Sequence, residues 1–551
     1  MDTAARVWPA FILAAAVGWA EPGTASAAPS TMPGKDDVRN AAAVVGDYYR
    51  IAKPCPAGSC EITNKWDDAV LMMGIIEHWR KHKTAAYKAY AENWARKNSW
   101  TLYSDLSGDQ QNPGWDNRMT AGYTYLRLLQ AGSAGASVAN VTTNLNNQLA
   151  LKLTPERQGL IDYVFPGQTK SSRSWKAVDA NFMALPEWIT MGKHAGKASY
   201  YARGFELQNY QVNVMGLRDP TSKLWYRDEA AKPKRSPDGK KIFWGRGNGW
   251  IAGALAIALS ELPTSRPEYA AYRARFTELM SAVRTRQRAD GFWNMNLADP
   301  NHYPAPETSA TALFTFAMAR GIALGILSGA TYRPVAAKAW NAMVATAIRN
   351  DGFLGYCQGI GGAPVPPSNA TYPDEDSTAN FCVGAFLLAG AAMYDIAPAA
   401  GPSAAAVSGG AYPVTTYQAE ALTTAVSSGL AQSGISSRYA RGGRATSAPL
   451  RGAGDFVEFT VPDIPDGTYR LRVRFLRDEL SGIWQLKADG VNAALPVDGY
   501  DVVPHYAEVD LGSVTFSQGP APKRFRFEVT GKNNYSASYR IGIDSIALMA
   551  Q

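Results

Sequence analysis

A short segment near the middle of the chain combines side chains that suit a sugar-binding site. Residues 244–250 read Trp-Gly-Arg-Gly-Asn-Gly-Trp, and glycines in a turn let a ligand approach the backbone. Arg246 supplies a permanent planar cation suited to a carboxylate, and Asn248 can both donate and accept hydrogen bonds. Trp244 and Trp250 offer faces that stack on sugar rings. The pattern also fits a helix-entry loop with structural tryptophans, so the segment alone leaves both interpretations open.

An aspartate in an apolar environment is the second candidate for chemistry. Asp179 follows Trp175 within residues 174–188, which are strongly apolar and helical in pattern. Removing a carboxyl group from water raises its pKa above about 3.9, and a raised pKa suits a general acid. The alternative is a helix N-cap or a buried carboxylate paired with arginine, and the residue types alone favour that alternative.

Long amphipathic segments, which would position these residues, occupy residues 36–396 and alternate with connections rich in Gly, Pro and Asp. Residues 250–262 carry Ile251 and Leu255 at helical spacing. Residues 308–327 are apolar nearly all round, as expected of a helix buried between others. Strand-like alternation is scarce, and the region is too large for a simple bundle. We predict a toroid of helical hairpins.

The character of the sequence changes after a linker. Residues 397–413 are rich in Ala, Gly, Ser and Pro, a composition typical of linkers. Polar and apolar residues then alternate at 456–461, 469–475 and 524–529, separated by turn sequences such as Asp-Gly. We predict that residues 414–551 form an all-β sandwich or jelly roll.

The N-terminus has the features of an export signal. Residues 1–27 place Arg6 before an apolar run and end in an Ala-Ser-Ala cleavage pattern. The run is too short to span a bilayer, so we predict a secreted or periplasmic protein without a membrane partner. The formal net charge of +8 would suit acidic glycans or nucleic acid. The basic clusters are short and lack a nucleic-acid-binding motif, so we expect no nucleic acid partner.

The cysteines suggest an oxidising compartment. Cys55 and Cys60 bracket a Pro-Ala-Gly-Ser turn, and we expect them to form a small disulfide loop. Cys357 and Cys382 flank a long loop and either pair or stay free. The chain has five histidines and no Cys-x-x-Cys spacing, so we expect no metal site in the helical domain.

Five segments of the helical region follow the order and spacing of a known enzyme group: residues 178–186, 243–250, 290–293, 306–309 and 352–361. They resemble the unsaturated glucuronyl and rhamnogalacturonyl hydrolases of glycoside hydrolase families 88 and 105, over roughly residues 38–395. The resemblance implies an (α/α)6 barrel without a cofactor. It also implies that the substrate is an oligosaccharide with a terminal unsaturated uronic acid. Polysaccharide lyases leave such ends, and these enzymes hydrate the C4–C5 double bond and expel the neighbouring sugar.

The resemblance also implies roles for particular residues. Asp179 would be the acid and base that protonates C4, and Arg246 with Trp250 would line the sugar subsite. Asp116 is a candidate for a second catalytic carboxyl group. The remaining residues that we assign to substrate binding are Trp175, Asn117, Arg227, Trp244, Asn248 and Glu307.

Two positions depart from the family pattern. The second site aspartate of the family falls near residues 115–122, where alignment on Gly122 puts Asn117 rather than Asp116 at its place. Either residue could fill the role. The stretch before the Trp-Gly-Arg-Gly sequence often carries a histidine, and here Arg227 lies near that place. These departures predict a divergent branch with its own substrate detail.

The C-terminal region resembles accessory domains of glycan-degrading enzymes, including carbohydrate-binding modules. In such modules a Glu and a late Asp can hold a structural calcium ion, which makes Glu420 and Asp544 candidate calcium ligands. A purely structural module fits the sequence equally well.

Two other functions fit the same residues. A conventional glycosidase on the same barrel would use Asp179 and Glu307 as paired carboxyl groups, about 5–9.5 Å apart. A glycan-binding protein on an inactive scaffold would leave recognition to the C-terminal domain. The presence of Asp179, Arg246 and Asn248 argues against that second alternative.

Overall fold

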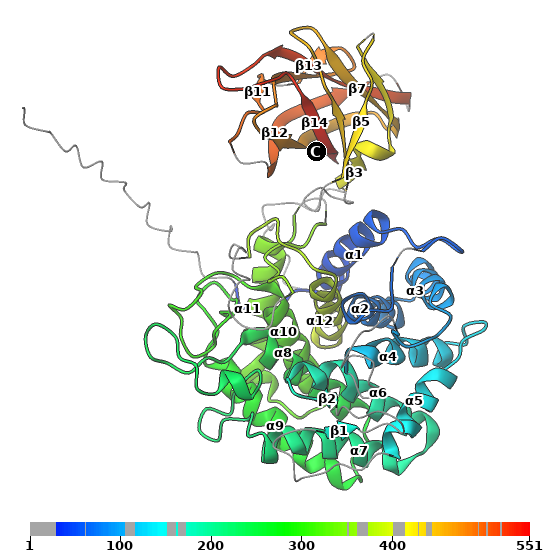
Figure 1. Ribbon diagram of the computed structural model, residues 1–551, viewed down its shortest axis with the longest axis vertical. Helices are drawn as coiled ribbons and strands as arrows, with labels where there is room; N and C mark the ends of the chain where they lie inside the picture. The colour runs from blue at the N-terminus through cyan, green and yellow to red at the C-terminus, as the bar shows by residue number, and fades with distance from the viewer. Residues whose placement is uncertain are drawn as a thin grey trace, which may run out of the picture.

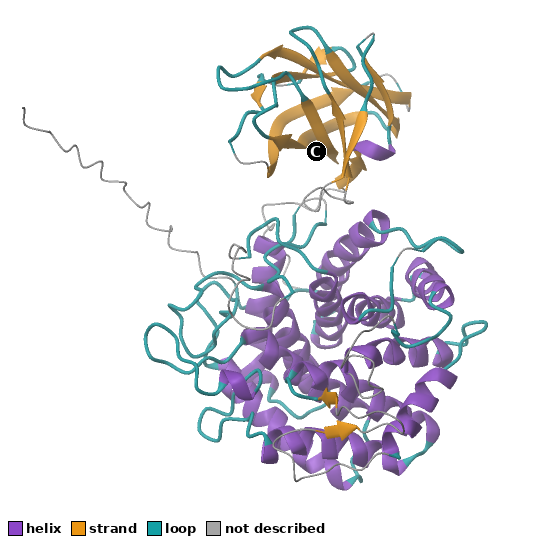
Figure 2. Cartoon of the chain, in the orientation of Figure 1, coloured by secondary structure: helices purple, strands orange, loops and turns teal. Residues whose placement is uncertain are grey.

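The computed structural model describes residues 29–349, 352–360, 373–399 and 414–550, apart from residues 61, 105–115, 151–160, 164–171, 428, 437–443, 494, 503–504, 518 and 520. The expected export signal at residues 1–27 lies outside these residues, as does most of the expected linker at 397–413. Helices dominate the described chain up to Ile396, and strands dominate it from Val414 onward (Figure 2). A helical domain is therefore followed by a β domain, as predicted.

Six helices form a closed ring at the centre of the helical domain (Figure 1). Each packs against the next, and the last packs against the first. The ring consists of α2 (Trp66–His82), α4 (Asp116–Gln130), α6 (Asp179–Ala195), α8 (Gly245–Glu261), α10 (Thr308–Ala323) and α12 (Asn380–Ile396). The outer helices are α1 (Lys35–Ala52), α3 (Ala85–Lys97), α5 (Ala139–Leu149), α7 (Ala198–Asn209), α9 (Pro267–Arg284) and α11 (Gly329–Ala342). The predicted (α/α)6 barrel is confirmed, with one unexpected addition, the paired short strands β1 (Ile161–Tyr163) and β2 (Ser172–Ser174).

The inner helices are apolar on all sides because each lies between two neighbours and the outer layer. Every residue of α6 from Ala180 to Gly192 is buried. Where α2 meets α12, a Cβ on Gly74 would lie 2.5 Å from the carbonyl oxygen of Gly384. The two backbones can therefore approach this closely only because both positions are glycine.

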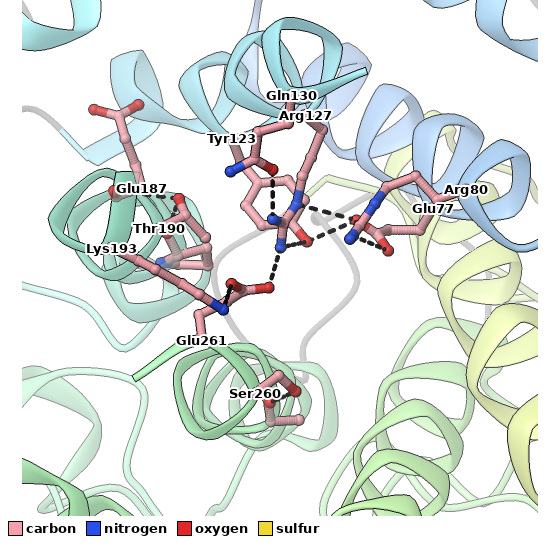
Figure 3. Close-up of polar contacts among 12 residues, drawn as sticks. Glu77, Arg80, Tyr123, Arg127, Gln130, Glu187, Thr190, Lys193, Ser260 and Glu261 are labelled. Carbon is pink, nitrogen blue, oxygen red and sulfur yellow. Dashed lines mark hydrogen bonds and ion pairs between the residues drawn. The ribbon is translucent and has the colours of Figure 1, made fainter. Parts of the chain in front are cut away.

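Ion pairs join the inner helices near their C-terminal ends (Figure 3). Arg127 of α4 lies 3.4 Å from Glu77 of α2 and 2.5 Å from Glu261 of α8. Lys193 of α6 reaches the other oxygen of Glu261, at 3.1 Å. The pairs Lys81–Asp395 and Arg320–Asp395 join α12 to α2 and α10. Ion pairs near the C-terminal ends therefore connect all six helices, so the helices end at one face of the barrel and begin at the other.

The C-terminal domain is a sandwich of two antiparallel sheets, as predicted. Its core contains Phe459, Trp484 and Phe527, which alternate with outward-facing residues. One sheet has the order β10 (Val491–Asn492), β9 (Ile483–Ala488), β13 (Ala521–Gly531), β7 (Phe456–Ile464) and β4 (Thr423–Val426), with β11 (Val497–Asp498) beside β9. The other has the order β12 (His505–Phe516), β8 (Gly467–Arg477), β14 (Ile541–Ala550), β6 (Arg444–Ala448) and β5 (Ser433–Ser436), with β3 (Val414–Gln418) beside β14.

Both cysteine pairs form disulfides. The Cys55–Cys60 pair is confirmed, and Cys357 is joined to Cys382, which resolves the alternative left open by the sequence. Within the described ranges, each helix is too short or too polar to cross a membrane.

Candidate active site

The N-terminal ends of the inner helices bring several predicted site residues to one face of the barrel. Asp116 is the first residue of α4, and Asp179 is the first residue of α6. Arg246 lies in the first turn of α8, and Glu307 is the N-cap of α10. The positive ends of helix dipoles favour an anionic group at such a face. The barrel therefore gathers acidic and basic side chains where an anionic sugar could approach.

Asp116 and Asp179 interact electrostatically. Asp116 is 9% exposed, and burial together with the charge of Asp179 raises its pKa to about 7. Burial also raises the pKa of Asp179, against the opposing charges of Arg227 and Arg246. The Oδ2 atom of Asp179 is buried and has no hydrogen-bond partner among the described residues. Asp116 can therefore hold a proton near neutral pH, and Asp179 keeps one carboxyl oxygen without a hydrogen bond to the described protein.

Arg246 is held rigidly beside this pair. Its guanidinium lies 4.6 Å from the ring centroid of Trp244 and 4.7 Å from that of Phe381. Nη1 donates to the carbonyl oxygen of Gln358 at 2.7 Å, and Nη2 donates to that of Gly359 at 3.0 Å. Burial lowers the pKa of Arg246 to about 10, so the group stays charged at neutral pH. Its position is fixed because both terminal nitrogens already donate to the backbone.

Arg227 is the more accessible of the two arginines that act on Asp179. Its side chain is 33% exposed, and Nη1 donates to Oδ2 of Asp228 at 2.8 Å. Its carbonyl oxygen accepts a hydrogen bond from the N–H of Val178 at 2.9 Å, which ties it to the start of α6. The arginine that stands near the family's usual histidine position therefore lies at the site. Asn117, the second residue of α4, is partly buried there.

The side chain of Asn248 is fully used within the protein. Its Oδ1 accepts a hydrogen bond from the N–H of Trp225 at 2.8 Å. Its Nδ2 donates to the carbonyl oxygens of Trp225 and Trp244, at 3.0 and 2.9 Å. An amide has two N–H donors, so both are occupied. Asn248 thus anchors the segment that carries Arg227 to the first turn of α8.

The carboxylate of Glu307 is also fully engaged. It caps α10 by accepting hydrogen bonds from the N–H groups of Ser309 at 3.0 Å and Ala310 at 2.7 Å. It accepts further hydrogen bonds from Oγ of Ser309 at 2.5 Å and from the N–H of Gln358 at 3.2 Å. Glu307 therefore positions the segment that holds Arg246, and these contacts leave it poorly placed to act on a substrate.

The glycine-rich segment is not the open turn that its sequence suggests, because it forms the first turns of α8. A Cβ on Gly245 would lie 2.7 Å from the carbonyl oxygen of Asn294. A Cβ on Gly249 would lie 3.0 Å from the side chain of Leu313. These glycines make room for neighbouring parts of the protein, not for a ligand.

The tryptophans that the sequence analysis assigns to substrate binding are buried in the protein, so their faces pack against neighbouring side chains and not against a sugar. Trp244, Trp250 and Trp175 are 2%, 0% and 1% exposed. Sequence reasoning missed Trp66, the first residue of α2, which is only partly buried and stacks on Phe381 with ring centroids 5.2 Å apart. An aromatic residue at the start of an inner helix is the signal that could have identified it.

Comparison with known proteins identifies the family. The model of glycosyl hydrolase family 88 matches residues 50–397. The chain belongs to this family. An unsaturated 3S-rhamnoglycuronyl hydrolase from Formosa agariphila is 30% identical to this family 88 hydrolase over 347 residues, which are 59% of this chain and 83% of the relative. An unsaturated rhamnogalacturonyl hydrolase from Bacillus subtilis is 29% identical over 294 residues, which are 52% of this chain and 77% of the relative.

A solved structure agrees with this assignment. The glycosyl hydrolase family 88 structure from Bacteroides vulgatus matches with a TM-score of 0.57 and 27% identity, and covers 66% of this chain and 99% of that one. The predicted family and the predicted class of enzyme are thereby confirmed.

The C-terminal domain of this family 88 hydrolase lies beyond the family match. Its candidate calcium ligands differ in environment, since Glu420 is exposed and Asp544 is fully buried. Asp544 forms an ion pair with Arg474 at 3.0 Å. In the described part of the chain, no three His, Cys, Asp or Glu side chains gather as a metal site. The calcium site stays a prediction.

Proposed function

We propose that this exported hydrolase removes the terminal unsaturated uronic acid from oligosaccharides by hydrating its C4–C5 double bond. The observation that carries the proposal is the pair Asp116 and Asp179. Both have raised pKa values and lie at the barrel face where Arg227 and Arg246 also act. The two disulfides fit a protein that works outside the cytoplasm.

Asp179 is the proton donor in this proposal. It gives its proton to C4 while a water molecule adds its oxygen to C5, and the proton of that water returns to the Asp116–Asp179 pair. The product at C5 is a hemiketal, whose C5–O5 bond breaks to give a ketone at C5 and a hemiacetal at C1. The hemiacetal collapses to an aldehyde, its hydroxyl proton passes to the glycosidic oxygen, and the neighbouring sugar leaves as an alcohol. The protein thereby regains its starting protonation state.

The substrate carboxylate would lie against the two arginines. Arg246 contributes a fixed charge, because its terminal nitrogens are already bonded to Gln358 and Gly359. Arg227 is exposed enough to contact the carboxylate directly. A planar guanidinium suits this contact, since it can bind both oxygens of a carboxylate.

The sugar next to the uronic acid is proposed from the relatives. The Formosa agariphila relative is named a 3S-rhamnoglycuronyl hydrolase and the Bacillus subtilis relative a rhamnogalacturonyl hydrolase. Both names join a uronyl group to rhamnose. We therefore propose an unsaturated uronyl group linked to rhamnose as the substrate class.

A panel of lyase-generated oligosaccharides tests the proposal. Loss of the enol-uronate absorbance, with release of the neighbouring sugar, is the expected result for uronyl-rhamnose substrates. The matched saturated disaccharide should not be cleaved, because hydration requires the double bond. Cleavage of the saturated sugar at a comparable rate would instead support a conventional glycosidase.

A further inference from the structure

An ion pair connects the β sandwich to the catalytic domain. Arg474 lies on β8 and Asp376 lies just before α12, and Nη1 of Arg474 is 2.7 Å from Oδ1 of Asp376. The Arg474 side chain is only 6% exposed. On its other side it pairs with buried Asp544 at 3.0 Å. The guanidinium is therefore held within the sandwich by one carboxylate and bound to the barrel through another.

The segment that carries Asp376 is joined to residues 356–358. The N–H of Tyr356 donates to the carbonyl oxygen of Asp374 at 2.6 Å, and the N–H of Cys357 donates to the carbonyl oxygen of Ser377 at 2.8 Å. The Cys357–Cys382 disulfide links residues 356–358 to α12. Two backbone hydrogen bonds and one disulfide therefore connect the segment around Asp376, residues 356–358 and α12.

Residues 356–359 in turn hold the charged part of the active site. The carbonyl oxygens of Gln358 and Gly359 bind the guanidinium of Arg246, and the N–H of Gln358 donates to Glu307. The charge of Arg246 opposes the burial-driven rise in the pKa of Asp179. A continuous series of contacts thus leads from the sandwich to Asp179.

We propose that Arg474 is a positioning residue for the active site and that the β sandwich is part of the catalytic unit. Through Asp376, it fixes the segment whose carbonyl oxygens orient Arg246. The family match ends at residue 397, so Arg474 belongs to the added domain. The linker composition predicts that a barrel truncated at about residue 403 folds and remains active. The Arg474–Asp376 ion pair predicts instead that the truncated barrel loses activity.

Asp376→Asn is the cleanest test in the full-length protein, because it leaves the Arg474–Asp544 pair intact. Arg474→Ala is its partner for a double-mutant cycle. Arg526→Ala is the control, since it breaks an Arg–Glu pair of the same length, with Glu458 at 2.7 Å, on the opposite sheet, where the arginine is 36% exposed. Asp376 also pairs with Arg349, so Arg349→Ala measures the part of the effect that does not involve the sandwich.

Hydrogen exchange tests the positioning role of Arg474, and kinetics test its effect on the proposed reaction. Amide exchange at residues 355–358 should be faster in Asp376→Asn and in Arg474→Ala than in the wild type or Arg526→Ala. This readout does not depend on the substrate. The kinetic effect rests on the proposed function: kcat/KM should fall about fivefold or more. The alkaline limb of the pH profile of kcat/KM should shift to higher pH, because a displaced Arg246 lowers the pKa of Asp179 less.

Equal exchange and equal pH profiles in Asp376→Asn, Arg474→Ala and Arg526→Ala would overturn the proposal. So would a double variant whose effects are simply additive, or an Arg349→Ala variant that accounts for the whole effect. If the wild type cleaves no unsaturated oligosaccharide, the proposed function fails while the exchange result still tests the positioning role. Arg474→Lys should restore part of the activity, because it keeps a cation that can reach Asp376.

Discussion

Burial and the charge of Asp179 raise the pKa of Asp116, so the carboxyl group that begins α6 affects the titration of the carboxyl group that begins α4. Burial is the larger cause of the shift at Asp116. This relationship places a carboxyl group with a pKa of about 7, that of Asp116, within electrostatic reach of Asp179, whose own pKa burial raises.

Carbon NMR of labelled aspartate carboxyl groups should show one group that titrates near pH 7, the value to which burial and Asp179 raise the pKa of Asp116. The signal should disappear in Asp116→Asn. In Asp179→Asn it should move to lower pH, because a neutral amide no longer repels the second charge. A wild-type protein in which every aspartate titrates in the ordinary acidic range would contradict this expectation.

The same pKa shift predicts a pH-dependent stability. The folded pKa of Asp116 lies above the unfolded value of about 3.9. Its contribution to the free energy of unfolding is therefore fully present below that value, and is lost as the pH rises through about 7. Urea titrations from pH 4 to pH 8 should show a smaller decline in Asp116→Asn than in the wild type. An equal decline in both would assign the pH dependence to other groups.

Asp179→Asn should keep the fold and lower turnover by about 100-fold to 10,000-fold, since an amide is nearly isosteric but cannot supply the proton. In heavy water the wild-type product should carry one deuterium at C4, on one face. The measurement must be early and set against a product-only control, because the ketone exchanges C4 hydrogens. An early product without deuterium at C4 would reject hydration.

Arg227→Ala should lower kcat/KM for the free acid by about tenfold to 100-fold, the scale of losing one partner of a charge pair. It should lower kcat/KM for the methyl ester much less. Arg246→Ala should weaken both substrates, because it also releases Gln358 and Gly359. Arg39→Ala, on an exposed part of α1, is the control. An Arg227→Ala variant that distinguishes acid from ester as the wild type does would exclude Arg227 as the carboxylate partner.

Glu307→Ala should lower the free energy of unfolding by about 1–3 kcal/mol, because it removes the cap of α10 and leaves buried N–H groups without a partner. Glu307→Gln keeps one oxygen acceptor and should lose less. Urea unfolding and kcat/KM measured together decide the role of this residue. A Glu307→Gln variant of unchanged stability but without turnover would point to a conventional glycosidase that uses Glu307 as a carboxylate.

The sequence by itself determined the two domains, the enzyme family and the helix that carries Asp179. Hydrophobic periodicity and five ordered segments are local features, so they need no knowledge of contacts. Only the tertiary structure decided what each polar side chain is free to do. Asn248 and Glu307 look like ligand-binding groups in the sequence, yet their atoms are occupied by N–H and carbonyl groups.

The sequence likewise did not predict which aromatic residues are buried or how the second domain contacts the barrel. Trp250 is fully buried and Trp66 only partly, although both are tryptophans near the starts of inner helices. The contact between Arg474 and Asp376 joins residues 98 positions apart. Burial and long-range pairing depend on how the elements pack, and no local pattern records that packing.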